Sequence, residues 1–351
     1  MIDKTQTSVR VTVFIPTFNR LALLKRAVAS VLACNCRVHL HILDNNSCDG
    51  TYDWLITLHD TELVTFQITR HPENIGATEN FIAGFRAIKT DFFVPLADDD
   101  ELAPDFLNKA IDIAGTYPDA GAVVGARANR DRDTWKVEWD TRRSTRLVQP
   151  KVHIQEFLTF GHYVTWSAIL WRSEVLNRYK LYESLKLYGL VSDVYFQFKY
   201  FLSSPVYIEP IPAATFSIRP GQACSMIGLT ADSIVDKGKL IALMQRELVI
   251  RFPDIDSSTE KSLLSHTVHN WALFIKHNRQ SAISAGRDIN LEQSIIAYID
   301  ALVPYIGFSA FPFLEEIQIR AGICSTEKRA RLRLLLLRMA NYISRLIRTK
   351  S

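Results

Sequence analysis

Short apolar runs alternate with longer amphipathic segments through the first 126 residues of the chain. This alternation is typical of a parallel sheet whose strands are joined by crossover helices. Helices are predicted at residues 21–32, around Phe81, Phe85 and Ile88, which share one helical face, and from Pro104 onward. Strands are predicted at residues 11–15, 38–43, 64–68, 92–96 and 122–126.

The pattern changes after residue 126. Residues 127–150 are strongly charged and have no period, which indicates a flexible excursion between two halves of a domain. Mixed α/β character with many aromatic residues returns over residues 151–220. We therefore predict an α/β domain over residues 1–222, with halves at 1–126 and 127–222. A helical region is predicted to follow it over residues 223–351, with helices near 230–250, 258–278, 291–305 and 326–348.

Composition indicates a globular protein in a reducing compartment. Of the 351 residues, 48% are hydrophobic, which is enough to bury one large core or two modest ones. The five cysteines have spacings that match neither a zinc site nor a disulfide framework, so the cytosol is expected, with Cys34 and Cys36 as packing residues. We expect no secretion signal and no transmembrane span, because no apolar run approaches the roughly 18 residues that a span requires.

Positive charge is concentrated in the tail at residues 328–351, which holds eight basic residues and no acidic one. The rest of the chain has 33 basic against 37 acidic residues. Five apolar residues of the tail fall on one helical face, flanked by arginines: Leu332, Leu336, Met339, Ile343 and Leu346. This pattern predicts a helix lying on an anionic membrane surface. Docking on the acidic body or on a second subunit of a homo-oligomer is the alternative; nucleic-acid binding is not expected, since no aromatic platform accompanies the charge.

Polar residues follow three of the predicted strands. Pro16, Thr17 and Asn19 come after the first strand, Asp44 after the second, and residues 98–100, all aspartate, after the fourth. Ligands of open α/β sheets bind at this carboxyl edge.

Three adjacent carboxylates repel one another unless a cation lies among them. Oxygen ligands of this kind suit Mg²⁺ or Mn²⁺, which take one or two carboxylates and complete their shell with water and phosphate. A solvated turn or an acidic helix start is the alternative for residues 98–100. The sequence has no HExxH, GxSxG or GxxxxGK[ST] motif, which disfavours zinc proteases, serine hydrolases and P-loop kinases.

Four segments occur in the order VFIPTFNR, ILDNNSCDGT, NIGATENFIAGF and VPLADDDELAPDFL. Together they resemble glycosyltransferase family 2, a group of inverting enzymes with the Rossmann-like GT-A fold, over roughly residues 9–220. The LADDDEL segment is similar to the branch that contains bacterial O-antigen sugar transferases such as abequosyltransferases. The resemblance makes residues 1–126 the nucleotide-binding half and residues 127–222 the half that holds the acceptor and the catalytic base.

The resemblance also assigns roles to particular residues. Contacts to the donor nucleotide are implied for residues of three loops: Pro16, Thr17, Asn19, Asp44, Asn74 and Gly76. Asp44 is implied to accept a hydrogen bond from the nucleobase or its ribose; an Asx turn is the alternative. For Asn74 and Gly76 the alternative is a plain turn before a helix.

The aspartate run departs from the commoner family pattern, because Ala97 stands where many relatives have aspartate. Asp98 and Asp100 then form the DxD pair and are implied to hold the metal, while Asp98 and Asp99 are implied to contact the donor. The sequence leaves open which of the three aspartates does which.

Three further positions complete the predicted site. The general base of an inverting transfer is implied to be Asp193 at a helix start, although Ser192 replaces the glutamate of many relatives; a helix cap is the alternative. Arg219 resembles a residue that closes over the donor diphosphate, and an ordinary surface arginine is the alternative. Trp166 is a weaker candidate for stacking on the acceptor sugar, against buried aromatic packing.

We therefore predict a metal-assisted glycosyltransferase that moves a sugar from a nucleotide-sugar donor to a glycan or a lipid-linked acceptor. Such an enzyme would be cytoplasmic and peripheral on the inner face of the cell membrane. A sugar nucleotidyltransferase and a non-catalytic module that binds nucleotide or glycan are the alternatives. A nucleotidyltransferase usually has a Gly-rich basic loop where this chain has PTFNR. A non-catalytic module needs neither the aspartate run nor Asp193, so the presence of both argues against it.

Overall fold

A computed structural model describes residues 10–131, 134–137, 144–160, 165–186, 192–215, 244, 247–248 and 250–255. The chain divides into two compact units, one formed by Met1–Phe157 with His162–Pro220 and the other by Leu158–Gly161 with Gly221–Ser351. Nearly all described residues belong to the first unit, so the architecture below is that of this unit. Arg219, the helices predicted beyond residue 255 and the tail at 328–351 lie outside the described residues.

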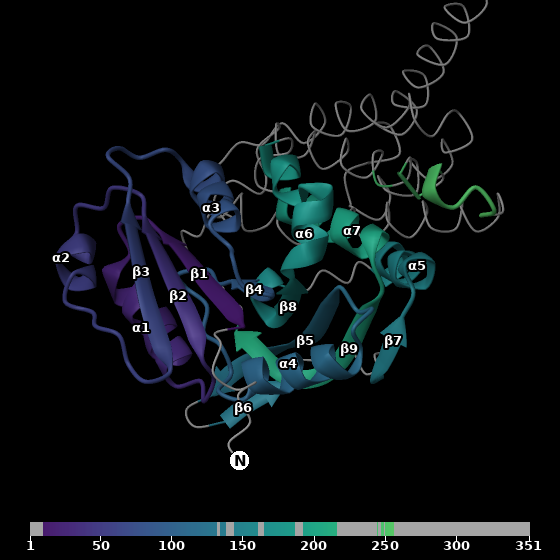
Figure 1. Ribbon diagram of the computed structural model, residues 1–351, viewed down its shortest axis with the longest axis horizontal. Helices are drawn as coiled ribbons and strands as arrows, with labels where there is room; N and C mark the ends of the chain where they lie inside the picture. The colour runs from purple at the N-terminus through teal and green to yellow at the C-terminus, as the bar shows by residue number, and fades with distance from the viewer. Residues whose placement is uncertain are drawn as a thin grey trace, which may run out of the picture. The chain divides into compact units, whose positions relative to one another are not determined.

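The described residues form a nine-stranded sheet with the order β3-β2-β1-β4-β8-β5-β9-β7, in which β6 pairs with β5 (Figure 1). The first four strands in this order are parallel, β8 is antiparallel to β4 and β5, and β9 is parallel to β5. The five predicted strands are confirmed as β1 to β5, and the α/β class is confirmed with them. The strands are β1 (Val11–Thr17), β2 (Val38–Asp44), β3 (Val64–Arg70), β4 (Phe92–Pro95), β5 (Ala122–Asp131), β6 (Thr134–Val137), β7 (Arg146–Val148), β8 (Ile169–Arg172) and β9 (Val206–Thr215).

The predicted flexible excursion at residues 127–150 is wrong for much of its length. Strand β5 continues to Asp131 and pairs antiparallel with β6, and β7 pairs with β9. An antiparallel ladder is held by backbone hydrogen bonds, and a sheet with one solvated face tolerates charged side chains. Loss of apolar periodicity therefore did not mean loss of strand structure.

Seven helices flank the sheet in the part of the chain that the structure describes: α1 (Leu21–Leu32), α2 (Thr51–Leu55), α3 (Ala77–Arg86), α4 (Phe106–Thr116), α5 (Pro150–Phe160), α6 (Ser173–Tyr179) and α7 (Ser192–Ser203). There are also two short 3-10 helices: Trp166–Ala168 precedes β8, and Leu181–Lys186 follows α6. The predicted 21–32 helix is confirmed as α1. The helix predicted to begin at Pro104 begins two residues later, because Ala103–Asp105 form a turn in which the Phe106 amide donates to the Ala103 carbonyl.

One face of the sheet is covered by α1, α2 and α4. Apolar side chains of these helices pack with alternate residues of β1 and β2, including Val13 and Leu40, in a continuous buried cluster. Cys34 and Cys36 belong to the same cluster, which confirms them as packing residues. Burial raises the pKa of the Cys34 thiol to about 12, so this cysteine stays protonated.

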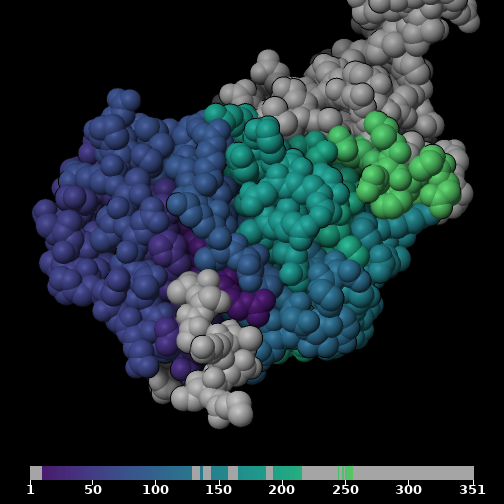
Figure 2. Space-filling model, in the orientation of Figure 1, coloured from purple at the N-terminus to yellow at the C-terminus, as the bar shows by residue number. Residues whose placement is uncertain are grey.

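Aromatic side chains cover the opposite face and attach α3 and α7 to the sheet. Phe14 of β1 meets Phe85 of α3 edge to face at 4.9 Å, and Phe196 of α7 lies 5.0 Å from the same ring. Gly84 lets α3 approach this closely, since a Cβ at that position would come within 2.3 Å of the Phe14 ring. The strands at both ends of the sheet consequently belong to one compact unit, whose described residues are coloured purple to teal in Figure 2.

Candidate functional site

Polar residues gather at the carboxyl edge of the parallel strands, where the sequence predicted them. Thr17 at the end of β1 is aligned with Asp44 at the end of β2, which is aligned with Arg70 at the end of β3. The Asn45 amide donates to the Thr17 carbonyl at 3.0 Å, so the loops after β1 and β2 leave the sheet side by side. Pro16 has no N–H to donate to a ladder, and regular pairing of β1 ends one residue beyond it.

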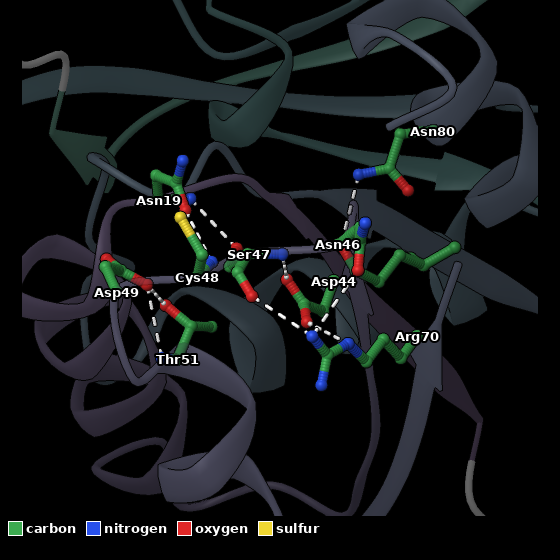
Figure 3. A network of polar contacts seen from close by, with 10 residues as sticks. Asn19, Asp44, Asn46, Ser47, Cys48, Asp49, Thr51, Arg70 and Asn80 are labelled. Carbon is green, nitrogen blue, oxygen red and sulfur yellow. Dashed lines mark hydrogen bonds and ion pairs between the residues drawn. The ribbon is translucent and has the colours of Figure 1, made fainter. Parts of the chain in front are cut away.

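These two loops are fastened to each other by side chains (Figure 3). The backbone N–H of Asn19 donates to Ser47 Oγ at 2.9 Å, and the side-chain Oδ1 of Asn19 accepts from the backbone N–H of Cys48 at 2.8 Å. Asn19 and Asn46 have φ values of +52° and +63°, in the left-handed region that asparagine tolerates better than most residues. The predicted nucleotide loop is therefore a rigid structure of two connected turns.

Asp44 is fully buried, and its two carboxylate oxygens differ in their hydrogen bonding. Oδ1 accepts from the Ser47 amide at 3.0 Å, which is the local turn that the sequence left open as an alternative. Oδ2 has no hydrogen-bond partner among the described residues; the Arg70 Nε lies 3.6 Å away as an ion pair (Figure 3). A buried carboxylate oxygen without a donor is costly, so this atom is suited to accept from an N–H or O–H of a ligand.

Arg70 was not predicted to belong to the site. Its guanidinium donates to the Ser47 carbonyl at 3.2 Å and lies over the Tyr52 ring at 4.4 Å, beside Asp44. The predicted third strand ended at residue 68, whereas β3 continues to Arg70, whose register places it next to Asp44; the predicted strand was therefore two residues too short to reveal this neighbour.

Asn74 connects the loop after β2 to the segment that leads into α3. Its Oδ1 accepts from Asn45 Nδ2 at 2.8 Å and from the Gly76 amide at 2.9 Å, while Asn45 Oδ1 accepts from the Ile75 amide at 2.9 Å. Gly76 precedes α3 with φ +83°, which a residue with a side chain rarely adopts. These contacts give both residues a structural role, and their contact with a donor stays a prediction.

The aspartate run meets the nucleotide loop directly. Asp98 Oδ2 accepts from Thr17 Oγ1 at 2.8 Å, and Asp98 Oδ1 accepts from Arg20 Nη1 at 3.0 Å. The same Arg20 nitrogen lies 3.4 Å from Asp99 Oδ2. Burial raises the pKa of Asp98 to about 6, although the Arg20 guanidinium and the Thr17 hydroxyl both favour its charged form. Burial of the Asp98 carboxylate thus outweighs the stabilisation that these two partners give to its charge.

Asp100 faces a different element from Asp98. It is 2% exposed and accepts at Oδ2 from Ser167 Oγ at 2.9 Å and from Thr165 Oγ1 at 3.5 Å. Ser167 also accepts from the Ala97 amide at 3.4 Å, so one hydroxyl contacts both ends of the 97–100 turn. Ser167 was not predicted, because a serine about seventy residues downstream carries no signal of this contact.

The donor set of this turn fits Mg²⁺ or Mn²⁺ by its chemistry. It consists of buried carboxylate oxygens, with Asp98 and Asp100 as the candidate ligands. Among the described residues, no three His, Cys, Asp or Glu side chains converge on one point. A site for these ions does not require three, since they take one or two carboxylates together with water and phosphate oxygens.

Asp193 and Trp166 lie on elements that the aromatic cluster connects. Asp193 is in the first turn of α7 and accepts at Oδ1 from the Val194 amide at 2.8 Å. Phe196 of the same helix contacts Phe85, and Phe85 lies 6.1 Å from Trp166. Trp166 is 9% exposed and packs at 4.5 Å on Phe81, so most of its ring serves the core. The base and acceptor roles of these two residues stay predictions.

Comparison with known proteins agrees with this architecture. Residues 12–180 match the family model described as Glycosyl transferase family 2. No curated protein sequence matches the chain significantly. Among solved structures, S. aureus TarS 1–349 in complex with UDP-GlcNAc has a TM-score of 0.65 at 14% identity, covering 89% of this chain and 88% of that one. A longer S. aureus TarS chain is matched over 53% of its length. The mannosyltransferase PcManGT from Pyrobaculum calidifontis, in complex with GDP-Man and Mn²⁺, has a TM-score of 0.50 at 15% identity, covering 91% of this chain and 87% of that one.

The mostly parallel sheet and its flanking helices define an α/β protein with a GT-A-like fold. The match to the family model for glycosyl transferase family 2 spans residues 12–180, just under half of the chain, and is a likeness in that part.

Proposed function

We propose that the protein is a glycosyltransferase that transfers a sugar from a nucleoside diphosphate sugar to a hydroxyl of a glycan or lipid-linked acceptor. The observation that carries the proposal is Asp44: a fully buried carboxylate at the carboxyl edge of the sheet, one oxygen of which receives no hydrogen bond from the part of the chain that the structure describes. A nucleobase imide or amino group, or a ribose hydroxyl, would supply that donor. Thr17 holds the aspartate turn against the loop after β1, and this closeness supports a diphosphate bound beside the turn.

The chemistry we propose is a single inverting displacement. The acceptor hydroxyl oxygen bonds to the anomeric carbon while the bond from that carbon to the diphosphate oxygen breaks, and the Asp193 carboxylate takes the hydroxyl proton. Asp98 and Asp100 would hold Mg²⁺ or Mn²⁺, which when bound supplies positive charge to the leaving diphosphate. Arg219, which lies outside the described residues, would add a guanidinium to the same leaving group.

A thermal-shift panel tests the donor class. UDP, GDP, ADP and thymidine diphosphate are each added with Mn²⁺ or with chelator, and one of them is expected to raise the melting temperature by about 5 °C at concentrations near 100 times its Kd. Asp44→Asn should weaken the binding of that nucleotide about 10-fold, because a charge-assisted hydrogen bond is lost while the Ser47 contact can be kept. If no nucleoside diphosphate changes the melting temperature of the unmutated protein, the proposed function is wrong.

A second proposal concerns where the acceptor is met. We propose that residues 328–351 hold the protein on an anionic membrane surface, such as the inner face of a bacterial membrane, where a lipid-linked acceptor of O-antigen type would be confined. Among the described residues, no helix is long and apolar enough to cross a membrane. Sedimentation with vesicles should be strong for anionic lipid, weak for neutral lipid, and lost when residues 328–351 are deleted. Equal sedimentation of the full-length and truncated proteins would exclude this role for the tail.

A further inference from the structure

Arg20 brings a positive charge to the aspartate turn. One guanidinium nitrogen lies 3.0 Å from Asp98 and 3.4 Å from Asp99, and so contacts two carboxylates of consecutive residues. The backbone of Arg20 is fixed at the start of α1, where its carbonyl accepts from the Leu23 and Leu24 amides. Its side chain, in contrast, is 37% exposed, so the guanidinium can change position without any change in the fold.

The carboxylates that Arg20 contacts depend on it. The side chains of Asp98 and Asp99 are only 8% and 11% exposed, so water screens their mutual repulsion weakly. Thr17 adds a hydrogen bond to Asp98 but no charge. A cation is therefore needed at this turn, and in the structure the Arg20 guanidinium fills that need.

A divalent cation and the Arg20 guanidinium compete for the same carboxylate. Oδ1 of Asp98 is bonded to Arg20 and Oδ2 is bonded to Thr17, so coordination of a metal by Asp98 requires that one of these bonds is given up. The repulsion between the metal and a guanidinium a few ångströms away falls most if Arg20 leaves. A diphosphate gives Arg20 an alternative anionic partner, since a guanidinium binds phosphate oxygens through two parallel N–H groups.

We propose that Arg20 exchanges partners during donor binding: it neutralises Asp98 and Asp99 until a nucleoside diphosphate arrives, and then moves to the diphosphate while Mg²⁺ or Mn²⁺ takes the carboxylates. This inference rests on the proposed function. Its consequence is that metal and nucleotide bind cooperatively, each raising the affinity of the other by the same factor. Arg20 is thus a positioning residue that couples the two ligands.

Mn²⁺ binding, followed by electron paramagnetic resonance of the free ion, tests this without measuring activity. Arg20→Gln should bind Mn²⁺ alone several-fold more tightly than the unmutated protein and should bind the nucleoside diphosphate selected by the thermal-shift panel several-fold more weakly in chelator. The factor by which Mn²⁺ raises nucleotide affinity, expected at about 5- to 150-fold in the unmutated protein, should fall several-fold, and what remains comes from the direct attraction between the metal and the diphosphate. Arg10→Gln removes the same charge from an exposed ion pair with Asp91 and should change none of these values.

Unchanged Mn²⁺ affinity and an unchanged coupling factor in a folded Arg20→Gln protein would overturn the proposal. If that variant does not fold, Arg20→Lys carries the test: an ammonium keeps the charge but not the planar pair of N–H groups, so the coupling factor must still fall several-fold. The titration with Mn²⁺ alone involves no nucleotide. Failure of every nucleotide to bind would therefore count against the glycosyltransferase proposal, while the Mn²⁺ titration would still show whether Arg20 competes with the metal for the carboxylates.

Discussion

Asp100→Asn is expected to abolish sugar transfer and the enhancement of nucleotide binding by metal, while the fold stays intact. Asparagine has the shape of aspartate, and its carbonyl oxygen can keep the hydrogen bond from Ser167 that the carboxylate accepts at 2.9 Å. The change removes one negative charge from the turn that is proposed to bind the metal. Nucleotide affinity, measured by calorimetry with Mg²⁺, with Mn²⁺ and with chelator, should become the same in all three conditions.

Asp91→Asn is the matched control for this variant. Asp91 is an exposed carboxylate whose ion pair with Arg10 lies before β4 rather than after it, so the control removes the same charge from the opposite end of that strand. Metal should still enhance nucleotide binding in the control protein. A metal-dependent mechanism would be wrong if chelator left the nucleotide affinity of the unmutated protein unchanged.

The strands and the carboxyl edge could be predicted because they depend on local pattern. Each buried parallel strand is a short apolar run, and the polar loop after it follows from where the run ends, as with Asp44 after β2 and the turn at 98–100 after β4. Strands β6 and β7 lack such runs. They are held by backbone pairing with β5 and β9, which the pattern of side chains does not reveal. That is why residues 127–150 were predicted to be a loop.

The residues that support the predicted site carry less signal in the sequence than the site residues themselves. Arg20 meets Asp98 across 78 positions, and Ser167 meets Asp100 across 67, so each contact depends on the tertiary fold. Arginine and serine are also common in loops, and neither residue type marks a site unless its partner is known. The carboxylates were conspicuous because three adjacent charges are costly, whereas the groups that offset this cost were not.

Asp193→Asn is expected to leave donor affinity near normal and to lower the turnover number by roughly 10²-fold or more, the scale of losing a positioned general base. Asp193 lies in the first turn of α7, where its Oδ1 accepts from the Val194 amide. Asparagine can accept the same hydrogen bond and is favoured at helix starts, so the stability of the variant should stay close to that of the unmutated protein. What asparagine lacks is a carboxylate that can take the proton of the acceptor hydroxyl.

Steady-state rates at saturating donor, together with calorimetric donor affinity and a melting temperature, separate the possible roles of Asp193. Glu183→Gln is the matched control, because Glu183 is an exposed carboxylate of the Leu181–Lys186 turn that precedes α7, and its loss should leave the rate unchanged. Near-full turnover in Asp193→Asn would remove this residue from the mechanism. A lowered melting temperature together with loss of donor binding would show instead that the carboxylate stabilises the start of α7. A different residue would then have to act as the base.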